Sequence, residues 1–169
     1  MRVYSKNGFL QEVIKGWYIP SRLDETAGES TAWYTSFWKF CASYLNTFFN
    51  KHWCLSAEQS LFLQTKNWRV PQQLLIRSPK ASNNITALPH DTSLLDIRAP
   101  TPAERNIVEK DQLRLFFLPA ALVSCSDKSF TQNPSELRTA LSMIRDSSEV
   151  LSLLLEGGHM KCTPSLGQL

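Results

Sequence analysis

An α+β fold is the class that this sequence predicts, and three observations along the chain lead to it. Two short aromatic and β-branched runs lie near the start, a long segment with helical apolar spacing follows, and four short β-rich runs then precede a helical end. Because strands in close succession tend to pair with their sequence neighbours, we expect a mostly antiparallel sheet accompanied by several helices.

The first predicted element is a β-hairpin. Phe9–Ile14 and Trp17–Pro20 are the two strand-forming runs, and Lys15 and Gly16 join them. Proline ends the second run because it cannot donate a hydrogen bond to a continuing strand.

A long amphipathic helix is predicted from Ser30 to about Asn50, because apolar residues recur at intervals of three and four. Ser30 or Thr31 can cap its first turn. The apolar stripe of this helix consists of Trp33, Phe37, Phe40, Cys41, Tyr44, Leu45 and Phe48. Its width indicates a helix that buries one face in the core.

The middle of the chain begins with a short predicted helix and continues as strands. Ser56, with Gln59 three residues on, has the residue types of a capping box and opens a helix through Leu63. Segment 99–112 is polar and without periodicity, which indicates a surface loop. The predicted strands are residues 73–77, 84–88, 94–98 and 113–117.

Helices are expected to close the chain. Residues 119–125 are apolar and short, while Asn133 and Pro134 are typical of a helix start. That second helix carries Leu137, Leu141 and Ile144 on one face. The last helix, residues 147–156, is expected to end at the glycine pair 157–158.

Length and composition limit the functions that are compatible with the chain. Its 169 residues suit one ordinary domain and leave no room for a second, large catalytic domain. Residues 1–80 hold ten Lys and Arg against five Asp and Glu, whereas residues 81–169 hold eight against ten. The basic first half is compatible with a polyanion partner, although solvated lysines give the same balance in many proteins that bind none.

The cysteines and the N-terminal segment bear on cofactors and location. The four cysteines, none in a Cys-x-x-Cys pair, are Cys41, Cys54, Cys125 and Cys162. With no His at a suitable offset from two of them, neither zinc nor any other cofactor is expected. Residues 1–19 lack the apolar run of a signal peptide and no stretch is long enough to span a membrane, so we expect a cytoplasmic protein with reduced thiols.

Candidate catalytic residues are few. Ser30 lies in Gly28-Glu29-Ser30-Thr31-Ala32, which lacks the final glycine of a nucleophile elbow, and His90 stands beside Asp91 in a predicted turn. Structural roles account for both residues: Ser30 can cap the following helix, and the residues around His90 are ordinary turn formers. A small hydrolase that uses Ser30 and His90 is kept as an alternative, but no catalytic residue is expected.

Basic side chains are the candidate binding residues. They flank the predicted hairpin and the first strand of the sheet, and phosphate contacts require only that such residues share one face. The candidates for phosphate or DNA contact are Lys15, Arg22, Lys66, Arg69, Arg77 and Lys80.

Two runs, Gly16-Trp17-Tyr18-Ile19-Pro20 and Glu58-Gln59-Ser60-Leu61, are the most distinctive in the chain. They resemble, over about residues 8–159, the N-terminal regulatory half of bacterial Fic-family (cell filamentation) proteins. That region is itself similar to AbiE-type antitoxin and transcriptional-regulator domains. The other segments that carry the resemblance are residues 8–15, Ser30–Tyr34, Phe37-Trp38, Val70-Pro71, Leu88-Pro89-His90 and residues 146–159. The resemblance implies a winged-helix DNA-binding module fused to a mixed domain, ahead of a Fic catalytic domain in the full proteins.

The resemblance also implies a division of the chain. Residues 1–22 correspond to a wing-like hairpin remnant, residues 23–159 to an α+β regulatory domain, and residues 160–169 do not match. The helices that precede the hairpin in the family have no counterpart here, so we expect a fragment cut at both ends. None of His52, His90 and His159 stands in the His-Pro-Phe-x-Asp/Glu-Gly-Asn-Gly-Arg loop on which Fic nucleotide transfer depends.

The expected function is a non-catalytic regulatory module that contacts DNA non-specifically, or that contacts a toxin or Fic partner. Without a recognition helix, base reading should be poor. The alternative is an inhibitory protein-interaction domain that does not bind DNA. An exposed apolar patch near Trp17, Trp33 or Trp38 would favour that alternative.

Overall fold

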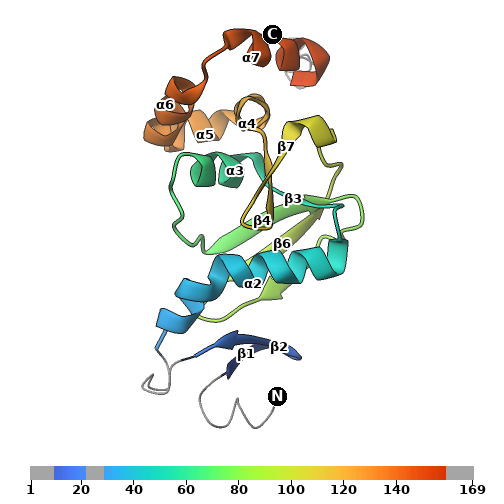
Figure 1. Cartoon of the computed structure of the whole chain (residues 1–169), viewed down its shortest axis with the longest axis vertical. Coiled ribbons are helices and arrows are strands. Elements are labelled where there is room, and N and C mark those ends of the chain that lie inside the picture. The colour runs from blue at the N-terminus through green and yellow to red at the C-terminus, as the bar shows by residue number, and fades with distance from the viewer. Residues whose placement is uncertain (1–9, 22–28, 159–169) are drawn as a thin grey trace. The chain divides into compact units, whose positions relative to one another are not determined.

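The computed structural model describes residues 10–21 and 29–158, which form an α+β fold, so the predicted class is confirmed (Figure 1). Its strands are β1 (Leu10–Ile14), β2 (Trp17–Pro20), β3 (Cys54–Leu55), β4 (Gln73–Ser78), β5 (Ile85–Ala87), β6 (Ser93–Arg98), β7 (Ile107–Lys110) and β8 (Leu113–Phe116). Its α-helices are α2 (Thr31–Phe49), α3 (Ala57–Gln64), α4 (Leu118–Ser124), α5 (Asp127–Gln132), α6 (Pro134–Met143) and α7 (Ser147–Leu153). A 3₁₀ turn, η1 (Glu104–Asn106), and a π-helical turn, η2 (Leu154–Gly158), complete the list.

The chain forms two compact units whose segments alternate along the sequence. Unit 1 comprises Met1–Trp53, Arg69–Thr101 and Lys110–Leu113. Unit 2 comprises Cys54–Trp68, Pro102–Glu109 and Arg114–Leu169. Each unit has its own buried side chains and is described separately.

In unit 1, β1 and β2 form the predicted antiparallel hairpin, with Gln11 opposite Ile19. Gly16 occupies the tight turn with a φ of +85°, a left-handed conformation that costs glycine little because it has no Cβ. The backbone N–H of Gly16 donates to Glu12 Oε1 over 3.1 Å and fixes the turn.

Helix α2 buries the aromatic stripe that its spacing predicts, since Trp33 and Phe37 are wholly buried and Phe40 is 5% exposed. The side-chain cap predicted at Ser30 is not formed. Ser30 has φ −96° and ψ −4°, a helical conformation rather than the extended one from which a capping hydroxyl reaches the next turn. Phe48, predicted as part of the stripe, is 57% exposed near the C-terminal end of the helix.

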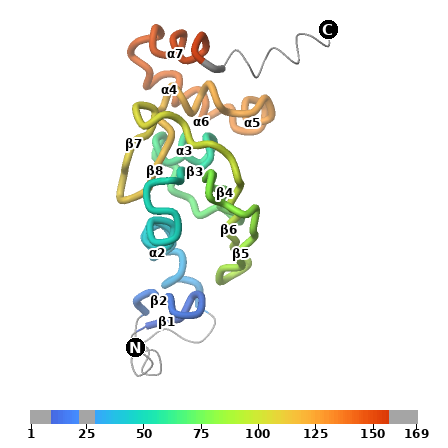
Figure 2. The backbone as a smooth tube through the Cα atoms, turned by 90° about the vertical axis from the view of Figure 1, so that its right-hand side faces the viewer, coloured from blue at the N-terminus to red at the C-terminus, as the bar shows by residue number. Residues whose placement is uncertain are grey.

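The strands of unit 1 are arranged in the order β4-β6-β5, and the sheet is mixed. Strand β6 runs antiparallel to β5, as expected, but parallel to β4, with Gln73 opposite Ser93. The parallel pair is possible because residues 79–92 cross from the end of β4 back to the start of β6. Trp33 Nε1 donates to Thr92 Oγ1 over 3.0 Å and ties α2 to this crossover. Figures 1 and 2 show the hairpin on one side of α2 and the sheet on another.

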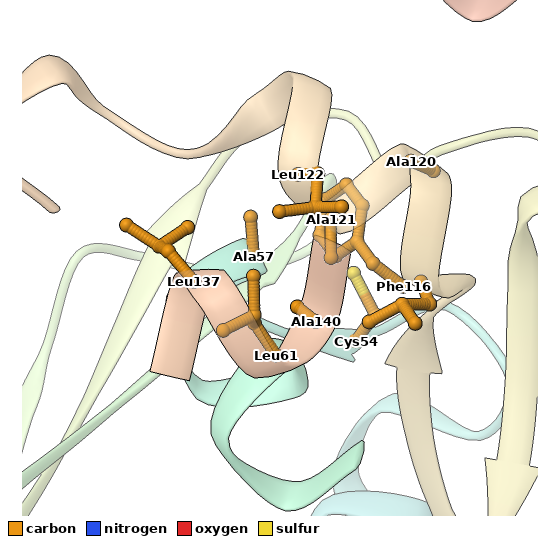
Figure 3. Packing of buried hydrophobic residues seen from close by; sticks show 10 residues of the cluster. Cys54, Ala57, Leu61, Phe116, Ala120, Ala121, Leu122, Leu137 and Ala140 are labelled. Atoms are coloured by element: carbon orange, nitrogen blue, oxygen red, sulfur yellow. The ribbon is translucent and has the colours of Figure 1, made fainter. Parts of the chain in front are cut away.

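Unit 2 is built around α3, β8, α4 and α6. The predicted cap of α3 is confirmed, because Ser56 Oγ accepts from the backbone N–H of Gln59 over 3.2 Å. The wholly buried Ser60 accepts from the backbone N–H of Phe116 over 3.0 Å, which joins α3 to β8. The buried cluster in Figure 3 consists of Cys54, Ala57, Leu61, Phe116, Leu118, Ala120, Ala121, Leu122, Leu137 and Ala140.

Three features of unit 2 differ from the sequence prediction. Strand β7 lies within the segment expected to be a loop and pairs with β8. At the C-terminal end, Leu141, which the sequence placed on one face with Leu137 and Ile144, is 55% exposed, and Leu151 and Leu155 are 58% and 78% exposed. The last helix also continues past its expected end, since η2 includes both glycines of the pair 157–158.

Candidate functional site

A groove of about 720 Å³ lies within unit 1 between β2 and α2. Five consecutive residues, 17–21, line it from the strand side. The helix side is lined by Thr31, Ala32, Thr35, Ser36, Lys39, Phe40 and Ser43. This volume lies in the range of about 300–1,000 Å³ that is typical of ligand-binding clefts.

The lining residues show how the groove is oriented. Successive side chains of a strand point to opposite faces, so consecutive residues line one groove only where the strand's edge faces it. The helix residues recur at steps of three and four and therefore share one face of α2. Strand β2 pairs with β1 and with no other described strand. The edge of β2 that faces away from β1, which no described strand pairs with, thus runs along the groove.

The chemistry of the groove combines an apolar floor with hydroxyl groups and one charge. Ile19 and Phe40 are buried at its base, and Trp17 is half-buried beside them. Lys39 is its charged lining residue; it is exposed and forms no ion pair with any residue that the structure describes.

Aromatic contacts hold the position of Trp17. Its ring centroid lies 6.0 Å from that of Phe40 and 5.2 Å from that of Tyr44, both edge-to-face, and 6.4 Å from that of Phe48. Such pairs stabilise beyond the area they bury, by about 0.5–1.5 kcal/mol each. The groove is therefore formed before any ligand arrives.

The six basic candidates are distributed between the two units. Lys15 is exposed in the hairpin turn, and Lys66 is exposed in unit 2. Arg69 is exposed, whereas Arg77 is half-buried on β4, and both already interact with other residues. Lys80 is exposed after β4 and lines a second cavity of unit 1. Arg22 lies outside the described residues.

The candidate catalytic residues do not form a pair. Ser30 occupies the start of α2, and His90 lies in the predicted turn, where its φ is +54° and the N–H of Thr92 donates to Pro89 O. The His90 ring lies 6.3 Å from that of Tyr34. No hydrogen bond joins Ser30 to His90, and neither residue lines the two cavities described here.

The thiols of Cys41 and Cys125 are held in the neutral form. Burial raises the pKa of Cys41 far above its ordinary range. Burial, aided by the charge of Glu58, raises the pKa of Cys125 from 9.0 to about 11. Because the thiolate is the reactive form, neither residue is an activated nucleophile at neutral pH. Cys162 lies outside the described residues.

Residues 10–21 and 29–158 contain neither a cluster of metal-ligating side chains nor a membrane-spanning helix. No three or more His, Cys, Asp and Glu side chains among them gather where they could hold a metal ion. None of the helices in these residues has both the length and the apolar character needed to cross a bilayer.

Lys39 is the binding-groove residue that the sequence reasoning did not select. Its signal is a polar stripe at every fourth position of α2, formed by Thr31, Thr35, Lys39 and Ser43 beside the aromatic stripe. Of the tryptophans named as markers of an interaction surface, Trp33 is wholly buried and Trp17 lines the groove.

Comparison with protein-family models, with curated proteins and with solved structures gives no match for this chain. The likeness to Fic regulatory regions stays a prediction that rests on residues 16–20 and 58–61 together with the weaker segments. What the chain does is therefore inferred from the geometry of its own residues.

Proposed function

We propose that the chain is a non-catalytic binding module that captures an extended segment of a partner protein along the unpaired edge of β2. The observation that carries this proposal is the shared groove, lined by the four residues of β2 with the following Ser21 and by one face of α2. An open strand edge offers backbone N–H and C=O groups to an added strand, and the adjoining helix face selects its side chains.

The groove defines the segment that it accepts. Backbone hydrogen bonds to β2 require an extended segment that is free of proline. Trp17 and Phe40 provide an apolar surface for one of its side chains, and Lys39 attracts a carboxylate one or two residues away. Pro20 ends the ladder because it lacks an N–H.

A toxin or a Fic enzyme is the kind of partner that the sequence resemblance suggests, and we propose that the complex forms in the cytoplasm. The free thiols of Cys41 and Cys125 support a reducing compartment. The lack of a paired nucleophile and base at Ser30 and His90 supports a binding role over a hydrolase.

Synthetic peptides test the groove directly. The probe is a capped ten-residue peptide of alternating Val and Glu, compared with one of alternating Val and Lys, with binding followed by backbone amide NMR. We expect the acidic peptide to shift the amides of β2 and to slow their hydrogen exchange. Methylation of every second peptide nitrogen removes the backbone donors on one edge and should abolish binding.

Two charge-reversal variants separate the groove from general electrostatics. Lys39→Glu should weaken the acidic peptide about tenfold or more, because an attraction becomes a repulsion inside the groove. Lys51→Glu changes the net charge equally at an exposed position outside the groove and should have little effect. Equal effects of both variants, or no shift at β2, would rule out capture at this edge.

Weak contact with duplex DNA is the second candidate function. The residues of unit 1 include eleven Lys and Arg against seven Asp and Glu, and those of unit 2 include seven against eight. The positive excess of the chain thus belongs to unit 1, which also contains Lys15 and Lys80. Such an excess supports electrostatic attraction to phosphates without base reading.

A further inference from the structure

The second cavity of unit 1, about 330 Å³, lies between the C-terminal part of α2, the loop after β4, and the strands β5 and β6. Apart from the aliphatic Leu94, its lining falls into three chemical classes. The helix contributes aromatic rings, the loop after β4 and strand β5 contribute hydroxyl and amide groups, and two opposite charges complete it. The residues are Tyr44, Phe48, Phe49, Lys80, Ser82, Asn84, Thr86, Leu94 and Asp96.

Asp96 is the fixed polar group of this cavity. It is 9% exposed, and its Oδ1 accepts from the backbone N–H of Asn84 over 2.8 Å and from that of Ser82 over 3.2 Å. Its own N–H donates to Asn84 O over 3.0 Å. These three hydrogen bonds join the loop between β4 and β5 to β6 and hold the carboxylate in one orientation.

The other carboxylate oxygen of Asp96, Oδ2, receives no hydrogen bond from any described residue. Oδ2 is accessible from the cavity, and a carboxylate oxygen there can accept a charge-assisted hydrogen bond, which is stronger than one between neutral groups. Oδ2 therefore favours a ligand that presents an N–H group.

The aromatic rings and Lys80 provide the remaining contacts. The ring centroids of Tyr44 and Phe48 lie 4.5 Å apart, and Phe48 is 57% exposed, so an aromatic surface remains open to a flat ligand. Lys80 is exposed and forms no ion pair with a described residue. A cation without a partner beside a cavity favours an anionic group on the ligand.

We propose that this cavity binds a nucleoside phosphate whose base carries an exocyclic amino group. The base stacks on Phe48 and Tyr44, its amino group donates to Asp96 Oδ2, and its phosphate lies near Lys80. Ser82, Asn84 and Thr86 are available to the remaining polar edges of the ligand. The site shares no lining residue with the groove along β2 and does not depend on the function proposed for that groove.

The base preference provides the first test. The probes are CMP and UMP, which differ in carrying an amino or a keto group at the same ring carbon. We expect CMP to bind about tenfold more tightly, because the keto oxygen of UMP opposes the carboxylate of Asp96. Binding is measured by calorimetry and by the NMR shifts of residues 82–86.

The variant Asp96→Asn makes this test sharper. Its amide oxygen can still accept from the N–H groups of Ser82 and Asn84, while its NH₂ group replaces Oδ2 with a donor. We expect the preference to reverse in favour of UMP. Unchanged amide shifts of residues 82–84 in the ligand-free variant would show that the hydrogen bonds from Ser82 and Asn84 to the side chain at position 96 are kept.

Two further variants test the phosphate and the stacking contacts. Lys80→Gln should remove the advantage of CMP over cytidine, whereas Lys51→Gln, outside the cavity, should leave it unchanged. Phe48→Leu keeps an apolar side chain against Trp17 but removes the stacking face, and it should weaken CMP several-fold.

The same chemistry is presented by free nucleotides and by single strands, so oligonucleotides distinguish the two sources. An octamer of dC that binds about tenfold or more tightly than CMP identifies a strand, and equal affinity identifies the free nucleotide. The proposal is overturned if neither CMP nor the octamer binds at about 1 mM. It is equally overturned if CMP and UMP bind alike, or if free phenylalanine, a zwitterion with an aromatic ring, binds more tightly than CMP.

Discussion

Arg114 shows at the level of one residue how unit 2 accommodates a buried charge. Its side chain is 3% exposed on β8, and its guanidinium donates to Glu104 over 2.6 Å and to Glu109 over 3.0 Å. The two carboxylates are 74% and 59% exposed. The arrangement is therefore asymmetric: the cation has left water, whereas its partners have not.

This asymmetry predicts which substitutions at the ion pair lower the stability of the chain most. Glu104→Gln with Glu109→Gln should destabilise the chain by about 3–5 kcal/mol, because the buried guanidinium loses two carboxylate partners. Arg114→Met should cost much less, since the two glutamates are already solvated. Urea unfolding of the full chain measures both values.

The triple variant of these three positions is the control. It has no buried guanidinium at position 114 and should be about as stable as Arg114→Met. If the double glutamate variant were no less stable than Arg114→Met, the carboxylates would not be compensating the guanidinium.

Cys125 gives a prediction that depends on pH. Its pKa of about 11 means that the folded state retains its proton where an ordinary thiol, with a pKa of 9.0, has lost it. The stability that it contributes is present below pH 9 and is lost as the pH rises through about 11. Alkylation of the Cys125 peptide, followed by mass spectrometry, should be slow at pH 8 and accelerate about tenfold per pH unit up to pH 10.

Glu58→Gln tests the cause of that pKa. The variant removes the negative charge beside the thiol, so the pKa of Cys125 should fall and its alkylation at pH 8 should accelerate. Glu58 also accepts from the hydroxyls of Ser126 and Ser129, bonds that a glutamine oxygen can keep. An unchanged rate would mean that burial alone sets the reactivity.

At the scale of elements, α2 shows what apolar spacing can predict. Its aromatic residues at intervals of three and four predicted both the helix and its buried face. That spacing places the residues along one side of a helix, where they can be buried together. The exposed end at Phe48 could not be foreseen, since the spacing does not show where the neighbouring elements end. Nor does it show that Lys39 lies beside a strand edge.

Phe37→Ala should lower the free energy of unfolding by about 3–5 kcal/mol, because it leaves a cavity at a wholly buried site. Phe48→Ala is the matched control on the same helix, and it should cost far less because that side chain is 57% exposed. Chemical denaturation compares the two. Equal losses would contradict the assignment of Phe37 to the core.

The hairpin of β7 and β8 shows why some elements escape sequence analysis. Its turn residues Asp111 and Gln112 both have positive φ, of 51° and 65°, a conformation that glycine and asparagine usually supply. Without those residue types, the segment lacked the usual signal of a hairpin. The parallel pairing of β4 with β6 was missed for a different reason, because strand direction depends on the crossover at residues 79–92 and not on the composition of either strand.

For the molecule as a whole, the combined charge of the basic residues sets the expected affinity for DNA. We expect weak, sequence-blind binding to duplex DNA, with dissociation constants of about 10⁻⁴ to 10⁻⁶ M near 0.15 M salt. If about five phosphates are neutralised, the logarithm of the affinity should fall with the logarithm of salt concentration at a slope near −4.5. Competition between unrelated duplexes measures whether the protein prefers one DNA sequence over another. A thousand-fold preference for one duplex would contradict sequence-blind binding, because it would require a helix that reads bases.

The alternation of the two units along the sequence has a consequence for biosynthesis. The chain passes between the units five times, so neither unit is a continuous stretch that can fold as soon as it is made. Unit 1 is complete only when Leu113 has left the ribosome, and α3 is synthesised 54 residues before α4, against which it packs. At about 5–20 residues per second, α3 waits roughly 3 to 11 seconds with its apolar face open to solvent. During that interval the nascent chain offers this helix to chaperones.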